Sequence, residues 1–289
     1  MVEERDMAGK PTETLGLDCQ RIRHLTGAGT QDSKITIVGL GSGGFPVMQH
    51  LAMSGWRRFT LIDPDKLESV NLVKHPGLRK DQGRLKIDIA AEWLADRNPH
   101  SEVVVDPRDI RDLAESEMSR LAEESDLIIS ATDSNSIRHM INDLCVRTQT
   151  PMTVGLVHRG GTGGTVMAFQ PGMSGCYMCL ETVSEGLEGL PADQDYPRSQ
   201  EEQDIIYGRG QRNYALAGLS ADIAIVSAIH AQASMAQLLD LEQAARSIPR
   251  LNASWMAIQI RLASNWEWQT TLIDLPKIDG CICCSNIRD

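Results

Sequence analysis

The sequence predicts an α/β fold: a Rossmann-like, doubly wound and mostly parallel sheet. Two observations predict it. Apolar strand-like segments and amphipathic helix-like segments alternate four times between residues 34 and 147, which is typical of a parallel sheet with helices on both faces. After Pro151 the pattern changes to paired segments of alternating polarity, so we expect the C-terminal part to add antiparallel strands.

The first strand and the turn after it organise the rest of the chain. The run Ile35–Val38 is apolar and β-branched, as in strands buried on both faces. Three glycines at G-x-G-x-x-G spacing follow it, namely Gly39, Gly41 and Gly44. Such glycines let a phosphate approach the free N–H groups at a helix N-terminus. Asp63 comes 19 residues after Gly44, where it can reach a ribose hydroxyl. We therefore predict nucleotide binding rather than a glycine-rich turn without function.

The remaining parallel part repeats this order of strand and helix. A long polar loop, 66–82, interrupts it, and long loops in compact domains are usually functional. We expect Leu85, Ile89 and Trp93 to form the buried stripe of the helix after this loop. The predicted elements are a first helix with Val47, Met48, Leu51 and Ala52 on its apolar face, strands at 59–62, 103–105 and 126–130, and helices at 83–96, 109–123 and 135–147.

The second half of the chain is predicted to be less regular. The acidic segment 181–213 lacks periodicity, and we interpret it as mobile. An Ala-rich apolar stretch, 214–241, predicts a long helix that packs inside the domain or across a dimer interface. The other predicted elements are strands at 152–155 and 165–169, a glycine turn at 160–164, a cysteine-containing loop at 176–179, and a β-hairpin formed by 255–262 and 266–273.

Composition limits the class of protein. Of the 289 residues, 42% are apolar, which suffices for a folded core. The net charge of −11 disfavours a nucleic-acid partner, because phosphate contacts need clustered Lys and Arg. No apolar run approaches the ~18 residues of a transmembrane helix, and the acidic start of the chain is unlike a signal peptide. We expect a cytoplasmic protein without a membrane partner, with 1–32 as an N-terminal arm, a short helix at 17–26, and 33–284 as one domain.

Two C-x-x-C pairs predict a structural zinc site. Because thiols stay reduced in the cytosol, the cysteines need a role other than disulfides. Cys176 and Cys179 form one pair and Cys281 and Cys284 the other, with 101 residues between Cys179 and Cys281. Four thiolates make a closed tetrahedral site, which would staple the C-terminal end onto the domain. The alternative is four buried or redox-active cysteines. Cys19 and Cys145 are predicted to take no part, with Cys145 in the core, and Cys283 is either a bystander or a replacement for a neighbouring ligand.

Polar residues near the predicted strand ends complete the candidate site. Asp133 follows the strand 126–130, at the sheet edge where open α/β folds bind ligands. A carboxylate there is suited to hold Mg²⁺ against nucleotide phosphates, and the alternative is a helix N-cap. Lys86 is either a phosphate ligand or an ordinary solvated lysine. His75 and His158 are acid–base candidates or solvated loop residues.

The motifs, in this order, resemble those of the ThiF/MoeB/HesA adenylyltransferases, which share their fold with the adenylation domain of ubiquitin-activating enzymes. They are GLGSGG, LIDPD, NLVKH, GRLK, SATDS, GCYMCL and a terminal C-x-x-C, between about Ser33 and Cys284. The resemblance implies one adenylation domain that uses ATP and Mg²⁺, carries a structural Zn²⁺ and forms a homodimer. It also implies a small ubiquitin-like or sulfur-carrier partner, whose C-terminal glycine is adenylated with release of pyrophosphate.

The same resemblance implies roles for individual residues. Asp133, Lys86 and Lys74 would be catalytic, with Asp133 holding Mg²⁺. Asp63 would bind the ribose, and Asn71 would lie beside the phosphates. The implied nucleotide-binding set is Gly39, Gly41, Ser42, Gly43, Gly44, Asp63, Asp65, Asn71, Lys74, Lys86, Asp133 and Ser134. Looser matches are Arg138 with Asn142, and an N-terminal arginine for the partner subunit's nucleotide, Arg21 or Arg23.

Three departures from the family pattern bear on activity. The family usually has a glycine at the position of Ser42 and an arginine at that of Lys74. Lysine keeps the charge but lacks the planar bidentate fork, so a weaker grip on phosphate is expected. Relatives that load the partner onto their own cysteine carry it in the segment 181–213, which contains none here. No thioester step is therefore expected on this chain.

Together these features predict ATP-dependent adenylation of a protein or peptide C-terminus. The attacking carboxylate is already ionised at neutral pH, so no general base is needed. Three alternatives stay open. They are adenylation of a ribosomal peptide or another substrate, a catalytically silent scaffold of the same fold, and an NAD-dependent oxidoreductase. The last would leave Lys86, Asp133 and the paired cysteines unexplained.

Overall fold

The structure, a computed structural model, describes residues 32–158, 163–185, 218–239, 256–262 and 268–285, together with Ile22 and Leu25. Several predictions fall wholly or mostly outside these residues: the short helix at 17–26, Cys19, Arg21, Arg23 and most of the acidic segment 181–213. The division into an N-terminal arm and one domain therefore stays a prediction.

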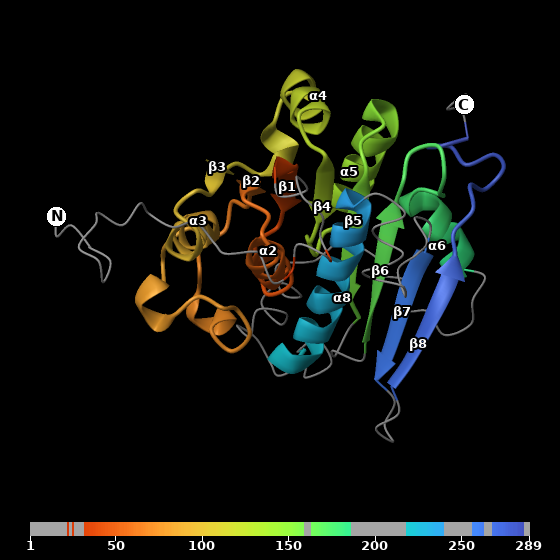
Figure 1. Cartoon of the computed structure of the whole chain (residues 1–289). Coiled ribbons are helices and arrows are strands. Elements are labelled where there is room, and N and C mark those ends of the chain that lie inside the picture. Colours follow the sequence, from red (N-terminus) through yellow and green to blue (C-terminus); the bar gives the residue numbers. More distant parts are fainter. Residues whose placement is uncertain are drawn as a thin grey trace.

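A single mixed sheet forms the centre of the molecule (Figure 1). Its strands are β1 (Lys34–Val38), β2 (Arg58–Ile62), β3 (Glu102–Asp106), β4 (Leu127–Ser130), β5 (Met152–Val157), β6 (Gly163–Phe169), β7 (Met256–Leu262) and β8 (Trp268–Asp274). Within the described residues the order is β3-β2-β1-β4-β5-β6-β7-β8. The strands from β3 to β5 pair in parallel, and those from β5 to β8 pair antiparallel. The predicted doubly wound sheet with antiparallel C-terminal strands is confirmed.

Helices cover both faces of this sheet. They are α2 (Gly44–Met53), α3 (Lys86–Arg97), α4 (Glu115–Glu123), α5 (Asn135–Thr148), α6 (Tyr177–Glu185) and α8 (Ser220–Leu238). Side chains alternate between the faces along each strand, so Ile35 and Ile37 pack with α2, α3 and α8, whereas Val38 packs with α4, α5 and α6. In Figure 1, α8 lies in front of the sheet. No helix in the described ranges has the length and apolar character that a membrane crossing needs.

Two helix predictions need correction. The helix predicted at 83–96 begins at Lys86, because the backbone of Leu85 is extended. Its predicted apolar stripe is also wrong in part, since Leu85 and Trp93 are only partly buried. The buried apolar residues of this helix are Ile87, Ile89, Ala90 and Leu94. The helix predicted at 109–123 is broken. The Asp109 carboxylate accepts the N–H of Arg111 and caps a short 3-10 turn, the chain then runs extended through Ala114, and α4 begins at Glu115.

The C-terminal half is more regular than predicted. The supposed loop at 176–179 becomes helical at Tyr177, and α6 continues to Glu185, so the first five residues of the acidic segment are helical. The long Ala-rich helix begins at Ser220, because Leu219 has an extended backbone. It packs against α2 and strands β4 to β6. One face of this helix thus packs inside the domain, and a dimer interface on its remaining surface stays a prediction.

Candidate functional site

The direction of the strand order changes at β1, which lies between β2 and β4. Ligands of open α/β sheets bind at such switch points, beyond the carboxyl ends of the strands. A cavity of ≈ 490 Å³ lies there, bordered by the segments that follow β1, β2 and β4. Of the twelve residues predicted to bind nucleotide, this cavity is lined by all except Gly44. The structure thus brings distant sequence segments to one site.

The glycines of the turn after β1 have different structural reasons. Gly39 has a φ of +94°, a conformation that favours glycine. At Gly44 a Cβ would lie 1.9 Å from the carbonyl oxygen of Gly39, so Gly44 permits the close packing of α2 against the strand end. At Gly41 and Gly43 a Cβ would meet no atom within 4 Å. These two glycines face open space in the cavity, as close approach of a ligand requires.

Asp63 is buried just after β2 and holds the backbone of two segments, the turn after β1 and the loop after β2. Its Oδ2 accepts the N–H of Leu40 at 2.6 Å, and its Oδ1 accepts the N–H of Asp65 at 2.8 Å. Burial raises the pKa of Asp63, whereas Lys86 and these two N–H groups act in the opposite direction. Each carboxylate oxygen has a second lone pair, so both can still accept a ribose hydroxyl.

Lys86 is buried at the start of α3, with only 7% of its surface exposed. Its Nζ donates to Oδ2 of Asp65 at 2.7 Å. The alternative of an ordinary solvated lysine is therefore wrong. Since both residues line the cavity, the ammonium group is kept at its wall by the loop that follows β2. Lys74, from the long loop 66–82, lines the same cavity.

Ser134 caps α5, and Asp133 does not. The hydroxyl of Ser134 accepts the N–H of Ile137 at 3.5 Å. Asp133 is exposed one residue earlier, on the wall of the cavity. The N-cap alternative for Asp133 is therefore wrong. Arg138, in the first turns of α5, is buried and donates from Nε and Nη2 to the carbonyl of Thr132 at 3.2 and 3.0 Å, so it braces the segment that carries Asp133.

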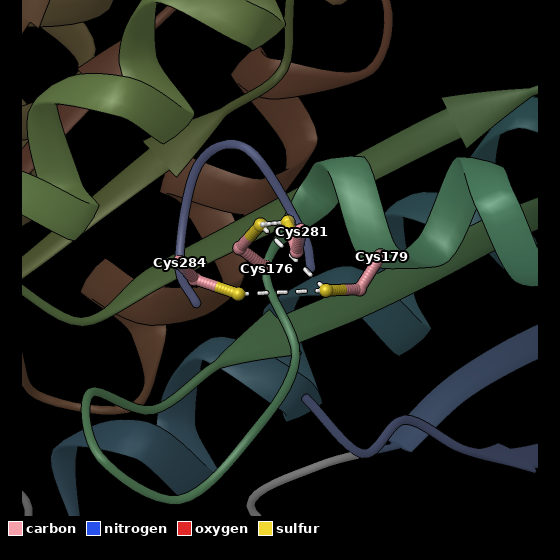
Figure 2. A group of neighbouring side chains, drawn as sticks. All are labelled: Cys176, Cys179, Cys281 and Cys284. Carbon is pink, nitrogen blue, oxygen red and sulfur yellow. Dashed lines mark hydrogen bonds between the residues drawn. The ribbon is translucent and has the colours of Figure 1, made fainter. Parts of the chain in front are cut away.

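The paired cysteines come together as predicted. Cys176 and Cys179 lie at the start of α6, and Cys281 and Cys284 lie in the turn after β8 (Figure 2). Their four Sγ atoms lie within 4.8 Å of one another, and all four side chains are buried. The shortest separations are 3.5, 3.7 and 3.9 Å. Sulfurs around a tetrahedral zinc, with Zn–S near 2.3 Å, are about 3.8 Å apart. The set therefore fits a closed zinc site.

Two further cysteines lie in the described part of the chain. Cys145 is fully buried in the apolar face of α5. Cys283 lies outside the group of four, and its Sγ accepts a hydrogen bond from Nδ2 of Asn142 at 3.1 Å.

Comparison with protein families and with known proteins identifies relatives of this chain. Residues 20–264 match the ThiF family. The chain belongs to the ThiF family. Its match to the molybdopterin-synthase adenylyltransferase of Escherichia coli is 33% identical over 155 residues and covers 53% of this chain and 60% of that enzyme. Its match to the SAMP-activating enzyme E1 of Haloferax volcanii is 29% identical and covers 51% and 53%. The matched part thus spans little more than half of these relatives' own length.

Solved structures show the same fold for this ThiF-family chain. Escherichia coli MccB with ATP superposes with a TM-score of 0.66, at 20% sequence identity, over 89% of this chain and 68% of that one. A second MccB structure, with AMPCPP and MccA, has a TM-score of 0.66 at 22% identity, over 89% and 67%. At such identity the likeness concerns the fold.

Some residues of this ThiF-family site have roles that sequence reasoning missed. His75 is buried; its Nε2 donates to the carbonyl of Leu40 at 2.9 Å, and its Nδ1 accepts the N–H of Gly77 at 2.9 Å. Burial lowers its pKa. His75 is therefore neither solvated nor free for acid–base work, but supports the glycine turn. In the sequence, the only indication of this role was that His75 lies in the long polar loop 66–82. His158 is partly buried and contacts Thr165, 2.9 Å away.

Asn142 and Arg138, which the family resemblance pairs, have different surroundings in the structure. It is buried and does not line the cavity with Arg138. Its Oδ1 accepts the N–H of Tyr177 at 2.7 Å, next to Cys176, while its amide contacts Cys283. Asn142 thus joins α5 to the cysteine group. Because α5 begins beside Asp133, one rigid helix connects the two sites.

Proposed function

We propose that the chain adenylates the C-terminal glycine carboxylate of a small ubiquitin-like or sulfur-carrier protein, using ATP and releasing pyrophosphate. The observation that carries this proposal is the single cavity at the switch point. It joins a glycine turn, the buried carboxylate of Asp63, the cations Lys74 and Lys86, and the exposed carboxylate of Asp133. Family relatives with adenylyltransferase names support it.

The proposed chemistry is positioning and charge neutralisation. A carboxylate oxygen of the substrate attacks the α-phosphorus, a new P–O bond forms, and the bond to the leaving pyrophosphate breaks. Lys86 and Lys74 offset charge on the phosphates. Asp133, whose carboxylate is not used for capping, is the residue that would hold Mg²⁺, and Mg²⁺ neutralises phosphate charge when bound. No base is needed, because the substrate carboxylate is already ionised.

The four cysteines have a structural role in this proposal. A Zn²⁺ with four thiolate ligands has no open position for water or substrate, so it takes no part in the reaction. Cys176 and Cys179 precede and begin α6, and Cys281 and Cys284 follow β8, so zinc would fix the end of the sheet to the domain. We further propose a cytoplasmic homodimer that binds neither nucleic acid nor membranes.

A second candidate is adenylation of a ribosomal peptide. The MccB structures that share the fold include complexes with ATP and with MccA, so a peptide remains a candidate substrate. A silent scaffold is the third candidate, and the changes at Ser42 and Lys74 are the features that favour it. An NAD-dependent oxidoreductase is disfavoured, because hydride transfer has no use for Lys86 and Asp133 at the same cavity.

Two measurements test the proposal. ATP with Mg²⁺ should raise the melting temperature of the purified chain, and NAD should not. Pyrophosphate should then be released with candidate carrier proteins or peptides, and mass spectrometry should find the acyl-adenylate at the C-terminus. A shift with NAD alone would favour the oxidoreductase, and ATP binding without turnover on any carrier or peptide would favour the scaffold.

A further inference from the structure

The cavity continues beyond the nucleotide end into a second compartment between β5 and α8. This compartment is lined by Gly155, Val157, Gly218, Ile223, Val226 and His230. None of these side chains is acidic or carries a permanent positive charge. The nucleotide end, in contrast, presents Lys74, Lys86 and Arg138. The compartment is therefore suited to a slim, uncharged segment and not to phosphates.

The strand order places this compartment relative to the nucleotide residues. Along the carboxyl edge of the sheet, Asp63 follows β2, the glycine turn follows β1, Asp133 comes after β4, and Gly155 lies near the end of β5. A nucleotide whose ribose is at Asp63 and whose phosphates lie over the glycine turn thus points its phosphates towards β5. The group that attacks phosphorus can enter from the β5 side.

His230 is one of three polar residues, with His158 and Ser227, that line this part of the cavity, and its contacts indicate where its proton lies. Three contacts form a chain. The Ser234 hydroxyl donates to the backbone carbonyl of His230 at 2.9 Å. The hydroxyls of Ser234 and Thr153 are 2.8 Å apart, and Nε2 of His230 lies 3.1 Å from the Thr153 hydroxyl. Ser234 has used its only proton, so Thr153 donates to Ser234. Nε2 of His230 must then carry a proton and donate to Thr153.

The other ring nitrogen, Nδ1, is consequently an acceptor. It lies beside Gly155, since a Cβ at Gly155 would come within 2.3 Å of Nδ1. Both residues line the cavity, and the hydrogen bonds of the ring in the described part of the chain go to the hydroxyl and the backbone of Thr153. Burial lowers the pKa of His230 to about 4, which keeps the ring neutral at neutral pH, so that Nδ1 carries a lone pair and no proton.

We infer that Nδ1 of His230 accepts a hydrogen bond from the last peptide N–H of the substrate, next to the carboxylate that is adenylated. This inference rests on the proposed function and names the group that recognises the substrate's backbone. An unprotonated nitrogen pairs with an N–H donor, and the terminal peptide group supplies one beside the reacting carboxylate. Gly155 and the apolar side chains of Val157, Ile223 and Val226 line the cavity beside it. His230 is thus a substrate-binding residue that aligns the carboxylate.

The test compares an amide with an ester. The probes are a short synthetic peptide that ends in Gly-Gly and its analogue in which glycolate replaces the last glycine, so that one N–H becomes an oxygen. Calorimetry on the full chain measures both dissociation constants. We expect the wild type to bind the amide about tenfold more tightly, the typical worth of one buried hydrogen bond.

Two variants make the comparison specific. His230→Gln places its amide near the position of Nε2, towards Thr153, and should reduce the amide-to-ester ratio to about one. His230→Asn places its amide oxygen near the position of Nδ1 and should keep most of the ratio. Equal binding of both probes by the wild type, a ratio unchanged in His230→Gln, or no peptide binding at all would overturn the inference.

The outcome is separable from that of the proposed function. The ATP-induced rise in melting temperature reports on the nucleotide end, where His230 has no contact among those described. Loss of that rise in the wild type would refute the adenylation proposal, while the amide-to-ester ratio would still decide the role of His230.

Discussion

Oδ2 of Asp63 accepts the backbone N–H of Leu40 at 2.6 Å, which joins the end of β2 to the turn that follows β1. The same turn is held from the other side by His75, whose ring donates to the carbonyl of Leu40. Both backbone groups of Leu40 are thus bound to side chains from other segments. The residue predicted to bind ribose therefore also shapes the phosphate turn, and its two roles are coupled.

This coupling predicts that Asp63→Ala affects both stability and nucleotide binding. The variant leaves the buried N–H of Leu40 without its acceptor, which should lower the free energy of unfolding by about 1–3 kcal/mol. The ATP-induced shift in melting temperature should also disappear. Denaturant unfolding and thermal melts with ATP measure the two effects. A variant of normal stability that still responds to ATP would contradict both roles.

Two glycines of the turn offer a matched pair. Gly44→Ala should lower the free energy of unfolding by more than about 2 kcal/mol, because its Cβ would lie 1.9 Å from the Gly39 carbonyl oxygen. Gly41→Ala should leave stability within about 0.5 kcal/mol, because its Cβ meets no atom within 4 Å, yet reduce ATP affinity by filling the space of a ligand. Unfolding curves with and without ATP distinguish the two. Equal stability loss in both variants would show that the turn is not arranged as described.

The zinc site predicts different outcomes for neighbouring cysteines. The wild type is expected to hold about one zinc per chain, and Cys179→Ala should lose most of it. The variant should also lose about 3 kcal/mol of the free energy of unfolding, which lowers the melting temperature by at least about 6 °C at 2–4 °C per kcal/mol. Cys283→Ala should keep the metal, because Cys283 lies outside the group of four. Metal analysis and thermal melts check both variants. A stable wild-type protein without zinc would refute the site.

Sequence patterns predicted those features that depend on local periodicity and spacing. The strand and helix alternation gave the parallel sheet, because each element must present an apolar face to a core whatever its neighbours are. The two C-x-x-C pairs predicted a long-range contact, since four thiols at that spacing have few other stable uses. Eleven of the twelve residues predicted to bind nucleotide line one cavity, because several of them follow strand ends, and strand ends of a parallel sheet meet at one edge.

Features that depend on tertiary partners were missed. A polar residue in a loop carries no sign of its burial, so the contact of His75 with Leu40 was not foreseen. The same holds for Lys86, which pairs with Asp65 from another segment. The break between Ile110 and Glu115 depends on one side-chain cap at Asp109, which a charged helical pattern conceals. The resemblance paired Asn142 with Arg138 without giving it a role, and its hydrogen-bond partners, Tyr177 and Cys283, lie at the cysteines.

The buried ring of His230 predicts a pH dependence of stability. Burial lowers its pKa from 6.5 to about 4. Between these two pH values the ring is therefore protonated in the unfolded chain and neutral in the folded chain. The free energy of unfolding should therefore fall as the pH drops from about 6.5 to about 4, by up to about 3 kcal/mol. His230→Gln should lose less over the same range. Burial also lowers the pKa of His75, but that effect is common to both proteins. Equal losses in urea unfolding would contradict the burial of His230.

Asp133 gives the sharpest test of the reaction. If its carboxylate holds Mg²⁺ against the phosphates, it acts mainly in the transition state, where charge moves towards the leaving pyrophosphate. Asp133→Ala should lower the rate of ATP–pyrophosphate exchange at least about a hundredfold, or about 2.7 kcal/mol. Its fold should persist, because Ser134 and not Asp133 caps α5.

The stability arm of this test uses the neighbouring residue. Ser134→Ala removes the cap and should lower the free energy of unfolding by about 1 kcal/mol, whereas Asp133→Ala should change it by less than about 0.5 kcal/mol. Asp133→Asn, which keeps the shape and loses the charge, should exchange pyrophosphate as slowly as Asp133→Ala, since an amide is a poor ligand for a hard cation that needs a negative charge. Normal exchange in Asp133→Asn would show that the residue does not hold the metal, and the proposed charge neutralisation would then fall to Lys74 and Lys86 alone.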